Sequence, residues 1–124
     1  MERILYEHLG GAAGISAIVD DLVEAHLRNP LIRHRFLPYL DRPDVVAAVK
    51  LHTRAFFGAA SGGPERYEGR SMPDAHRGMN ITDAEFAAAV EDIAATLERH
   101  AVDEGAREQV LVLANSLRSE IVNL

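Results

Sequence analysis

Apolar residues recur every three or four positions through most of this chain, and this spacing constrains the fold more than any other feature. The first such segment carries Ile15, Ile18, Val19, Leu22, Val23 and Leu27. Residues at this spacing share one face of an α-helix. Gly10-Gly11 precede the segment and Asn29-Pro30 follow it, so the helix is expected between these breaks.

The same spacing predicts three further helices, over residues 41–60, 82–97 and from about 103 to 121. The helix over residues 41–60 has Pro43 in its first turn, a position that suits proline. The helix over residues 82–97 begins with a capping box formed by Thr82 and Glu85. The apolar face of the segment 41–60 comprises Val45, Val49, Phe56 and Ala60. That of the segment 82–97 comprises Phe86, Val90, Ile93 and Leu97. That of the last segment comprises Val110, Leu113, Ala114, Leu117 and Ile121. No run alternates as a half-buried strand would, so the predicted fold class is all-α.

Residues 61–81 are punctuated by glycine and proline too often for a long helix or strand. A loop of this length is uncommon in a compact domain and is usually functional. It carries His76, with Met72, Met79 and Ile81 on either side. We therefore expect something apolar, such as a bound cofactor, to pack against this loop.

The composition narrows the class of protein. A chain of 124 residues is the size of one domain, expected to span residues 1–124. The net charge of −6 and the lack of a Lys/Arg run argue against nucleic-acid partners. No apolar stretch is long enough for membrane insertion and the N-terminus does not look like a signal peptide, so a cytoplasmic location is expected. The absence of cysteine excludes disulfides, thiolate metal sites and thiol catalysis.

Several motifs resemble those of the group I truncated haemoglobins. They are Leu5-Tyr6-Glu7-His8-Leu9-Gly10-Gly11, then Phe56-Phe57 followed by Gly62-Gly63-Pro64, then Tyr67-Glu68-Gly69, and the segment from Met72 to Thr82 around His76. Their order and spacing agree with the family over nearly the whole chain. The resemblance implies a truncated globin fold, in which a two-on-two helical sandwich surrounds one haem b.

The resemblance also assigns the cofactor contacts. His76 matches the proximal histidine that holds the iron. Met72, Ile81 and Phe86 match the residues that pack against the proximal side, and Phe36 and Phe57 match walls of the haem pocket. Asn115, Ser116 and Ser119 occupy the region where some members carry a histidine that binds haem covalently, so non-covalent haem is expected.

The distal side departs from the best-known pattern of the family. Many members carry a tyrosine that donates a hydrogen bond to bound oxygen, and here that position is Val23. Thr53 replaces the glutamine that often supports this tyrosine, and Val49 occupies a further position that is often glutamine or leucine. The strong hydroxyl donor is therefore missing.

Two histidines are candidates for the distal side. His52 lies three residues after Val49 and four before Phe56, which predicts that it points inward. In some cyanobacterial members a histidine at this position binds the iron when no gas is present, so His52 is expected to be an internal sixth ligand or to contact the gas. His26 follows Leu22 by four residues and is the alternative distal residue.

These features predict a protein that reversibly binds O2, CO or NO at ferrous haem. Nitric oxide dioxygenation, which would need a reductase partner, and haem electron transfer are the alternatives. Whether the chain is an enzyme, and its oligomeric state, stay open at this stage.

Overall fold

The structure is a computed structural model that describes residues 4–124; residues 1–3 of the expected domain lie outside the described part. The elements are α1 (Leu5–His8), α2 (Gly11–Arg28), the 3-10 turns η1 (Arg33–Arg35) and η2 (Leu37–Tyr39), α3 (Pro43–Ala60), α4 (Met72–His76), α5 (Asp83–Arg99), α6 (Glu104–Ser116) and α7 (Arg118–Ile121). The predicted all-α class is confirmed. Across residues 4–124, no helix has both the length and the apolar character needed to span a membrane.

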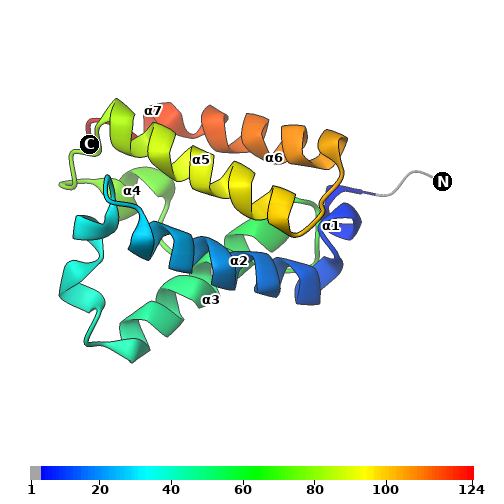
Figure 1. Cartoon of the computed structure of the whole chain (residues 1–124), viewed down its shortest axis with the longest axis horizontal. Helices are drawn as coiled ribbons and strands as arrows, with labels where there is room; N and C mark the ends of the chain where they lie inside the picture. The colour runs from blue at the N-terminus through cyan, green and yellow to red at the C-terminus, as the bar shows by residue number, and fades with distance from the viewer. Residues whose placement is uncertain (1–3) are drawn as a thin grey trace.

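The long helices form two layers of two (Figure 1). Helices α2 and α3 pack against each other in one layer, and α5 and α6 pack against each other in the other. Contacts between α2 and α5 join the layers. This arrangement is the two-on-two sandwich expected from the sequence.

Local chemistry sets the ends of two of these helices. Gly10 adopts a φ of +92° just before α2, a conformation that disfavours other residues. A Cβ atom on Gly14, in the first turn of α2, would clash with the carbonyl oxygen of Leu9. The predicted capping box starts α5, because Thr82 accepts a hydrogen bond from the backbone of Glu85 and Glu85 accepts one in return.

The last predicted helix is wrong in one respect, because it breaks at Leu117 into α6 and α7. The Ser116 hydroxyl donates a 2.6 Å hydrogen bond to the carbonyl oxygen of Leu113, and such local bonds compete with the helical pattern. The break brings the C-terminus back to the predicted loop. There the backbone N–H of Asn123 donates to Ile81 at 2.9 Å, and that of Gly78 donates to Leu124 at 2.7 Å.

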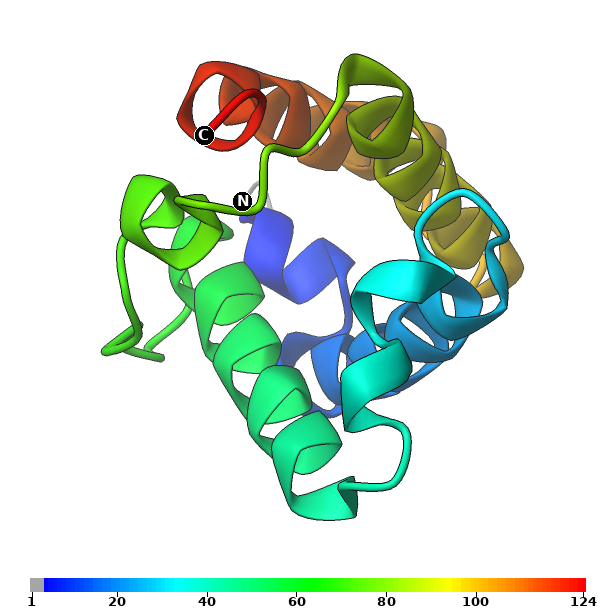
Figure 2. The same cartoon turned by 90° about the vertical axis from the view of Figure 1, so that its left-hand side faces the viewer.

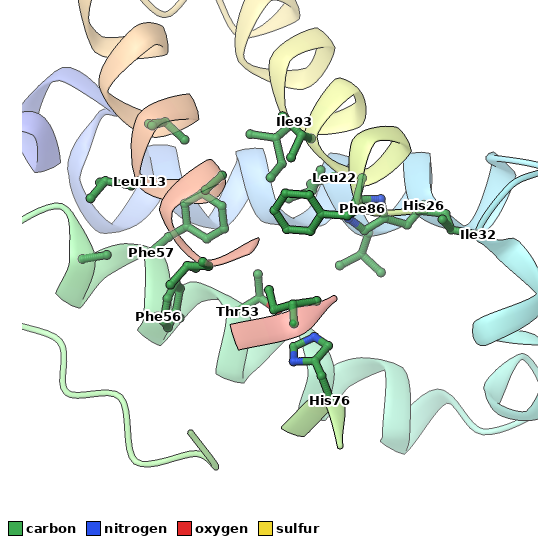
Figure 3. Close-up of a pocket in the computed structure, with 18 of the residues that line it drawn as sticks. Leu22, His26, Ile32, Thr53, Phe56, Phe57, His76, Phe86, Ile93 and Leu113 are labelled. Carbon is green, nitrogen blue, oxygen red and sulfur yellow. The ribbon is translucent and has the colours of Figure 1, made fainter. Parts of the chain in front are cut away.

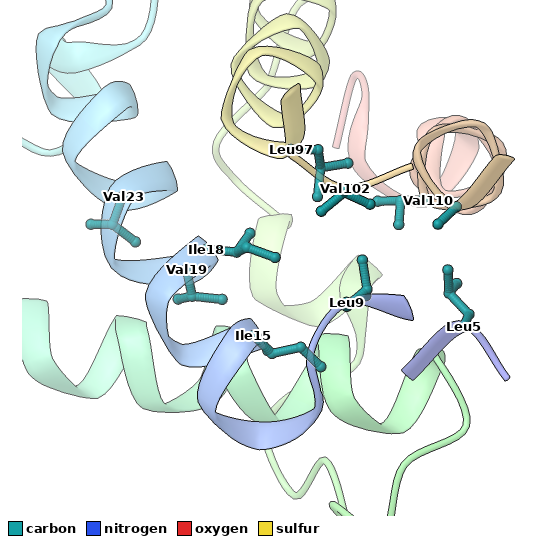
Figure 4. Close-up of a cluster of buried hydrophobic side chains, with 10 residues drawn as sticks. Leu5, Leu9, Ile15, Ile18, Val19, Val23, Leu97, Val102 and Val110 are labelled. Atoms are coloured by element: carbon teal, nitrogen blue, oxygen red, sulfur yellow. The ribbon is translucent and has the colours of Figure 1, made fainter. Parts of the chain in front are cut away.

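The main hydrophobic core occupies one end of the sandwich (Figure 4). It is formed by Leu5, Leu9, Ile15, Ile18, Val19, Val23, Leu97, Val102, Ala106 and Val110. A smaller cluster of Ile81, Phe86 and Val122 lies at the other end, where the C-terminal segment meets the start of α5. These two clusters leave the middle of the sandwich without a protein core.

Candidate functional site

A cavity of about 520 Å³ fills the middle of the molecule, between the two helical layers. Seen in Figure 2, the long helices surround this central region. The side chains that line the cavity come from helices α1 to α7 and from the segments between them, and several of them are drawn in Figure 3. A cavity of this size is large enough for a cofactor or small ligand.

Helix α3 shows that this cavity needs an apolar occupant. Its only buried residue is Gly58, although the helix is rich in apolar side chains. Val49, Phe56 and Phe57 are half-buried and line the cavity. An apolar helix face whose side chains stay only half-buried favours the binding of an apolar ligand.

His76, at the end of α4, reaches into the cavity from below in Figure 3. Its Nδ1–H donates a 2.8 Å hydrogen bond to the carbonyl oxygen of Met72, one helical turn earlier. Since a carbonyl can only accept, this bond places the proton on Nδ1 and leaves the lone pair of Nε2 free. An imidazole held in this way is the usual form of a metal-ligating histidine.

Most of the residues predicted to contact the haem or to form its distal pocket line the same cavity as His76. They are Val23, His26, Phe36, Val49, Thr53, Phe57, Ile81 and Phe86. Met72 does not line it and contributes instead the carbonyl group that orients His76. The Thr53 hydroxyl donates to the carbonyl oxygen of Val49 at 2.7 Å, so its proton is already engaged within α3.

The inward placement predicted for His52 is wrong in this structure. His52 is exposed, does not line the cavity, and packs edge-on against Tyr67 with 6.4 Å between ring centroids. Neighbouring helical positions differ by about 100°. The line of Val49, Thr53 and Phe56 faces the cavity, and His52 lies at the edge of this face. Its role as an iron ligand therefore stays a prediction.

Arg35 and Glu85 form an ion pair at the cavity wall that was not predicted from the sequence. Arg35 donates to both carboxylate oxygens of Glu85, at 2.7 and 2.8 Å, and also to the carbonyl oxygen of Met79 at 2.7 Å. The Arg35 guanidinium lowers the pKa of Glu85 to about 2. The pair joins η1 to the start of α5 and to the loop after His76. The capping box identified Glu85, but no local pattern pointed to its partner 50 residues away.

His26 forms a second, half-buried polar group at the cavity. Its Nδ1 lies 2.8 Å from Oδ2 of Asp92 on α5. The amide of Asn29 also donates to this carboxylate, at 3.1 and 3.2 Å. The imidazole stacks on Phe36 with an interplanar angle of 15°. The spacing along α2 pointed to His26, but no local pattern pointed to Asp92, which lies 66 positions away.

The comparisons with known proteins agree with this geometry. The family model for bacterial-like globins matches residues 4–123. A group 1 truncated haemoglobin of a Synechocystis species is 33% identical over 117 residues, which cover 90% of each chain. The chain belongs to the truncated haemoglobins, within the bacterial-like globin family. The resemblance noted in the sequence motifs is therefore confirmed.

Solved structures support the fold independently. The truncated haemoglobin of Tetrahymena pyriformis in its Fe(III) form superposes with a TM-score of 0.89 and 26% identity, covering 98% of this chain and all of that one. The cyanomet 2/2 haemoglobin of a Synechococcus species, with covalently attached haem, gives a TM-score of 0.83 and 29% identity over 95% of each chain. The truncated globin fold is thereby confirmed.

The cavity fits the cofactor of this family. Haem needs an apolar slot and an axial ligand, and the cavity offers both in its apolar lining and in the free Nε2 of His76. Ser116, in the region where the sequence analysis looked for a covalent attachment point, also lines the cavity. The serine hydroxyl is engaged with Leu113. This chemistry agrees with the expected non-covalent haem b.

Proposed function

We propose that this protein binds diatomic gases reversibly at a haem b whose iron is held by His76. The observation that carries the proposal is the Nδ1–H hydrogen bond from His76 to Met72, which leaves Nε2 directed to act as a ligand inside an apolar cavity. When bound, the haem supplies the iron at which the gas binds. His76 would hold this group through its Nε2, and the apolar side chains that line the cavity would exclude water from it.

Absorption spectra of the haem-reconstituted protein test this proposal. We expect a Soret band, stoichiometric haem binding, and a reversible shift of the ferrous spectrum on addition of CO. A protein that retained haem but gave no CO complex would contradict reversible gas binding. A protein that did not retain haem would contradict the cofactor itself.

The distal side of the cavity supports weak stabilisation of bound oxygen. Val23 is 4% exposed and lines the cavity at the position where many relatives carry a tyrosine. The Thr53 hydroxyl is held by Val49 and does not replace that donor. Oxygen is therefore proposed to dissociate faster here than from a truncated haemoglobin with the tyrosine.

Val23→Tyr is expected to slow oxygen dissociation about tenfold, because one added hydrogen bond contributes about 1.4 kcal/mol in a dry pocket. Val23→Phe is the matched control, since it adds the same ring without the hydroxyl. Stopped-flow measurement of oxygen release from both variants separates the hydrogen bond from the change in volume. Equal rates in the two variants would show that position 23 does not face the bound gas.

We also propose that His52 is an internal sixth ligand that gas displaces. The supporting observation is that position 52 lies beside the cavity-facing line of α3, so that a rotation away from Tyr67 would be needed to bring the imidazole inward. The orientation in which His52 packs against Tyr67 would then belong to the open state, in which the sixth position is free for gas. An internal ligand lowers the apparent gas affinity by the fraction of molecules in the open state.

His52→Leu is expected to convert a low-spin ferrous spectrum into a five-coordinate one and to raise the rate of CO association. Tyr67→Leu is the companion variant, because it removes the ring against which the open position rests and should shift the equilibrium toward the low-spin state. Spectra of the ferrous proteins without gas measure both changes. A wild-type protein that is already five-coordinate would rule out internal coordination.

Nitric oxide dioxygenation and electron transfer stay alternative predictions, because one globin scaffold can serve several haem reactions. Dioxygenation would need a stable oxygen complex and a reductase partner, and the missing distal tyrosine does not favour it. Electron transfer would need both axial positions filled in both redox states. The spectra described above distinguish the latter from gas binding.

A further inference from the structure

The polar groups that line the cavity are almost all paired with other protein groups. Arg35 and Glu85 neutralise each other. The hydroxyl groups of Thr53, Ser61 and Ser116 each donate to a backbone carbonyl. Among the described residues, the cavity-lining side chains with a ring nitrogen left over are therefore the two imidazoles of His26 and His76.

His26 and His76 share one arrangement. In each, Nδ1 forms a 2.8 Å hydrogen bond to an oxygen acceptor, which is Asp92 for His26 and the Met72 carbonyl for His76. In each, no hydrogen bond from Nε2 to another described residue is present. The His26 side chain is 16% exposed and its Nε2 is not among the buried unpaired atoms of residues 4–124, so this nitrogen borders open space.

The surroundings of His26 differ from those of His76 in charge. The Nδ1–H of His26 donates to the carboxylate of Asp92, and the Asp92 side chain is only 17% exposed. Asn29 donates to both oxygens of this carboxylate and keeps it in place. Stacking on Phe36 fixes the plane of the His26 ring. A neutral imidazole in this position has an accepting Nε2, and Asp92 stabilises the imidazolium that forms when Nε2 takes up a proton.

We propose that His26, oriented by Asp92, is a proton-accepting site that adapts the cavity to weak-acid ligands of the type HX, such as hydrogen cyanide and hydrogen sulfide. The proposal rests on haem binding through His76, the function proposed above. Nε2 of His26 accepts the proton of HX as the H–X bond breaks, and the anion X⁻ binds the ferric iron. The imidazolium then forms an ion pair with Asp92. The proton returns to X⁻ when the ligand leaves, so no oxidant or reductant is required.

This role predicts selectivity between two classes of ligand. Cyanide binds as an anion derived from a neutral acid, whereas NO carries no proton. A proton acceptor in the cavity accelerates only the first class, typically by about 100-fold or more. A change in cavity volume or in an internal ligand would instead alter the association rates of both classes of ligand, because both are measured with the ferric protein.

The test compares the association rates of cyanide and of NO with the ferric, haem-loaded protein at pH 7. His26→Phe keeps an aromatic ring against Phe36, and is expected to slow cyanide association about 100-fold relative to NO association. Asp92→Asn keeps the shape of the partner but removes its charge, and is expected to slow cyanide association about tenfold. Rates for cyanide that do not change, or that fall together with those for NO, would overturn the proposal.

A second measurement does not depend on rates. Nitrogen-15 NMR of the ferrous CO complex, which is diamagnetic, reports which ring nitrogen of His26 carries the proton. We expect the proton on Nδ1 in the wild type. A proton on Nε2 would overturn the proposal even if haem and CO bind normally, whereas failure of the wild type to bind haem or CO would instead contradict the function proposed above.

Discussion

Replacing His76 by glycine is expected to abolish tight haem retention. His76 is the imidazole of the predicted loop, and its Nε2 is free within the cavity. Removing the axial ligand should weaken haem binding by more than the ~10–100-fold that is typical when an outer-shell partner is lost. The rate of haem transfer to an excess of an acceptor globin measures this loss.

Two controls make the His76 result specific. Added imidazole should enter the space left in His76→Gly and restore a ligated spectrum, because the cavity walls remain. His100→Ala removes a histidine that pairs with Asp21 on the surface and does not line the cavity, so haem retention should not change. A His76→Gly protein that kept its haem as tightly as the wild type would refute the assignment.

Replacing Arg35 by methionine is expected to lower the free energy of unfolding by about 3 kcal/mol at pH 7. The change leaves the Glu85 side chain, which is 11% exposed, without the guanidinium, and with the imidazole of the exposed His34 at 3.4 Å from its Oε2. Losing one partner of such a pair costs about 3–5 kcal/mol, and partial exposure of Arg35 favours the lower value. The carbonyl group of Met79 also loses its donor. Urea denaturation of the fully haem-loaded proteins measures the difference.

The stability difference between wild type and Arg35→Met should depend on pH in one direction. The pKa of Glu85 is lowered in the folded state from 4.5 to about 2. The ion pair therefore stabilises the protein fully above pH 4.5, and this contribution is lost as the pH falls from 4.5 to 2. The two proteins should converge in this range. Arg33→Met, an exposed change on the same 3-10 turn, should shift stability by less than about 0.5 kcal/mol at any pH.

The long helices and the loop that carries His76 could be predicted from the sequence because their signals are local. A capping box at Thr82, a proline at the start of α3 and glycine at the start of α2 act within a few residues of themselves. The loop that carries His76 was likewise visible from its glycines and prolines. The short helix α4 inside it places the Met72 carbonyl one turn before His76, which is also a local relation.

Positions around the cavity were harder to predict because apolar spacing defines a helix face only to within one residue. His52 fits the spacing of α3 as well as Thr53 does, yet Thr53 lines the cavity and His52 is exposed. The orientation of α3 against α2 decides between these neighbours. That orientation depends on packing over the whole helix.

The sequence by itself determined the helical class, the order of the long helices and the loop that carries His76, since periodicity, caps and chain breaks act over short distances. Only the tertiary structure decided which distal side chains meet. Arg35 meets Glu85 across 50 positions, and His26 meets Asp92 across 66. Such pairs form because two layers of helices close around one cavity. No pattern within a short segment of the chain predicts which residues of the two layers will come into contact.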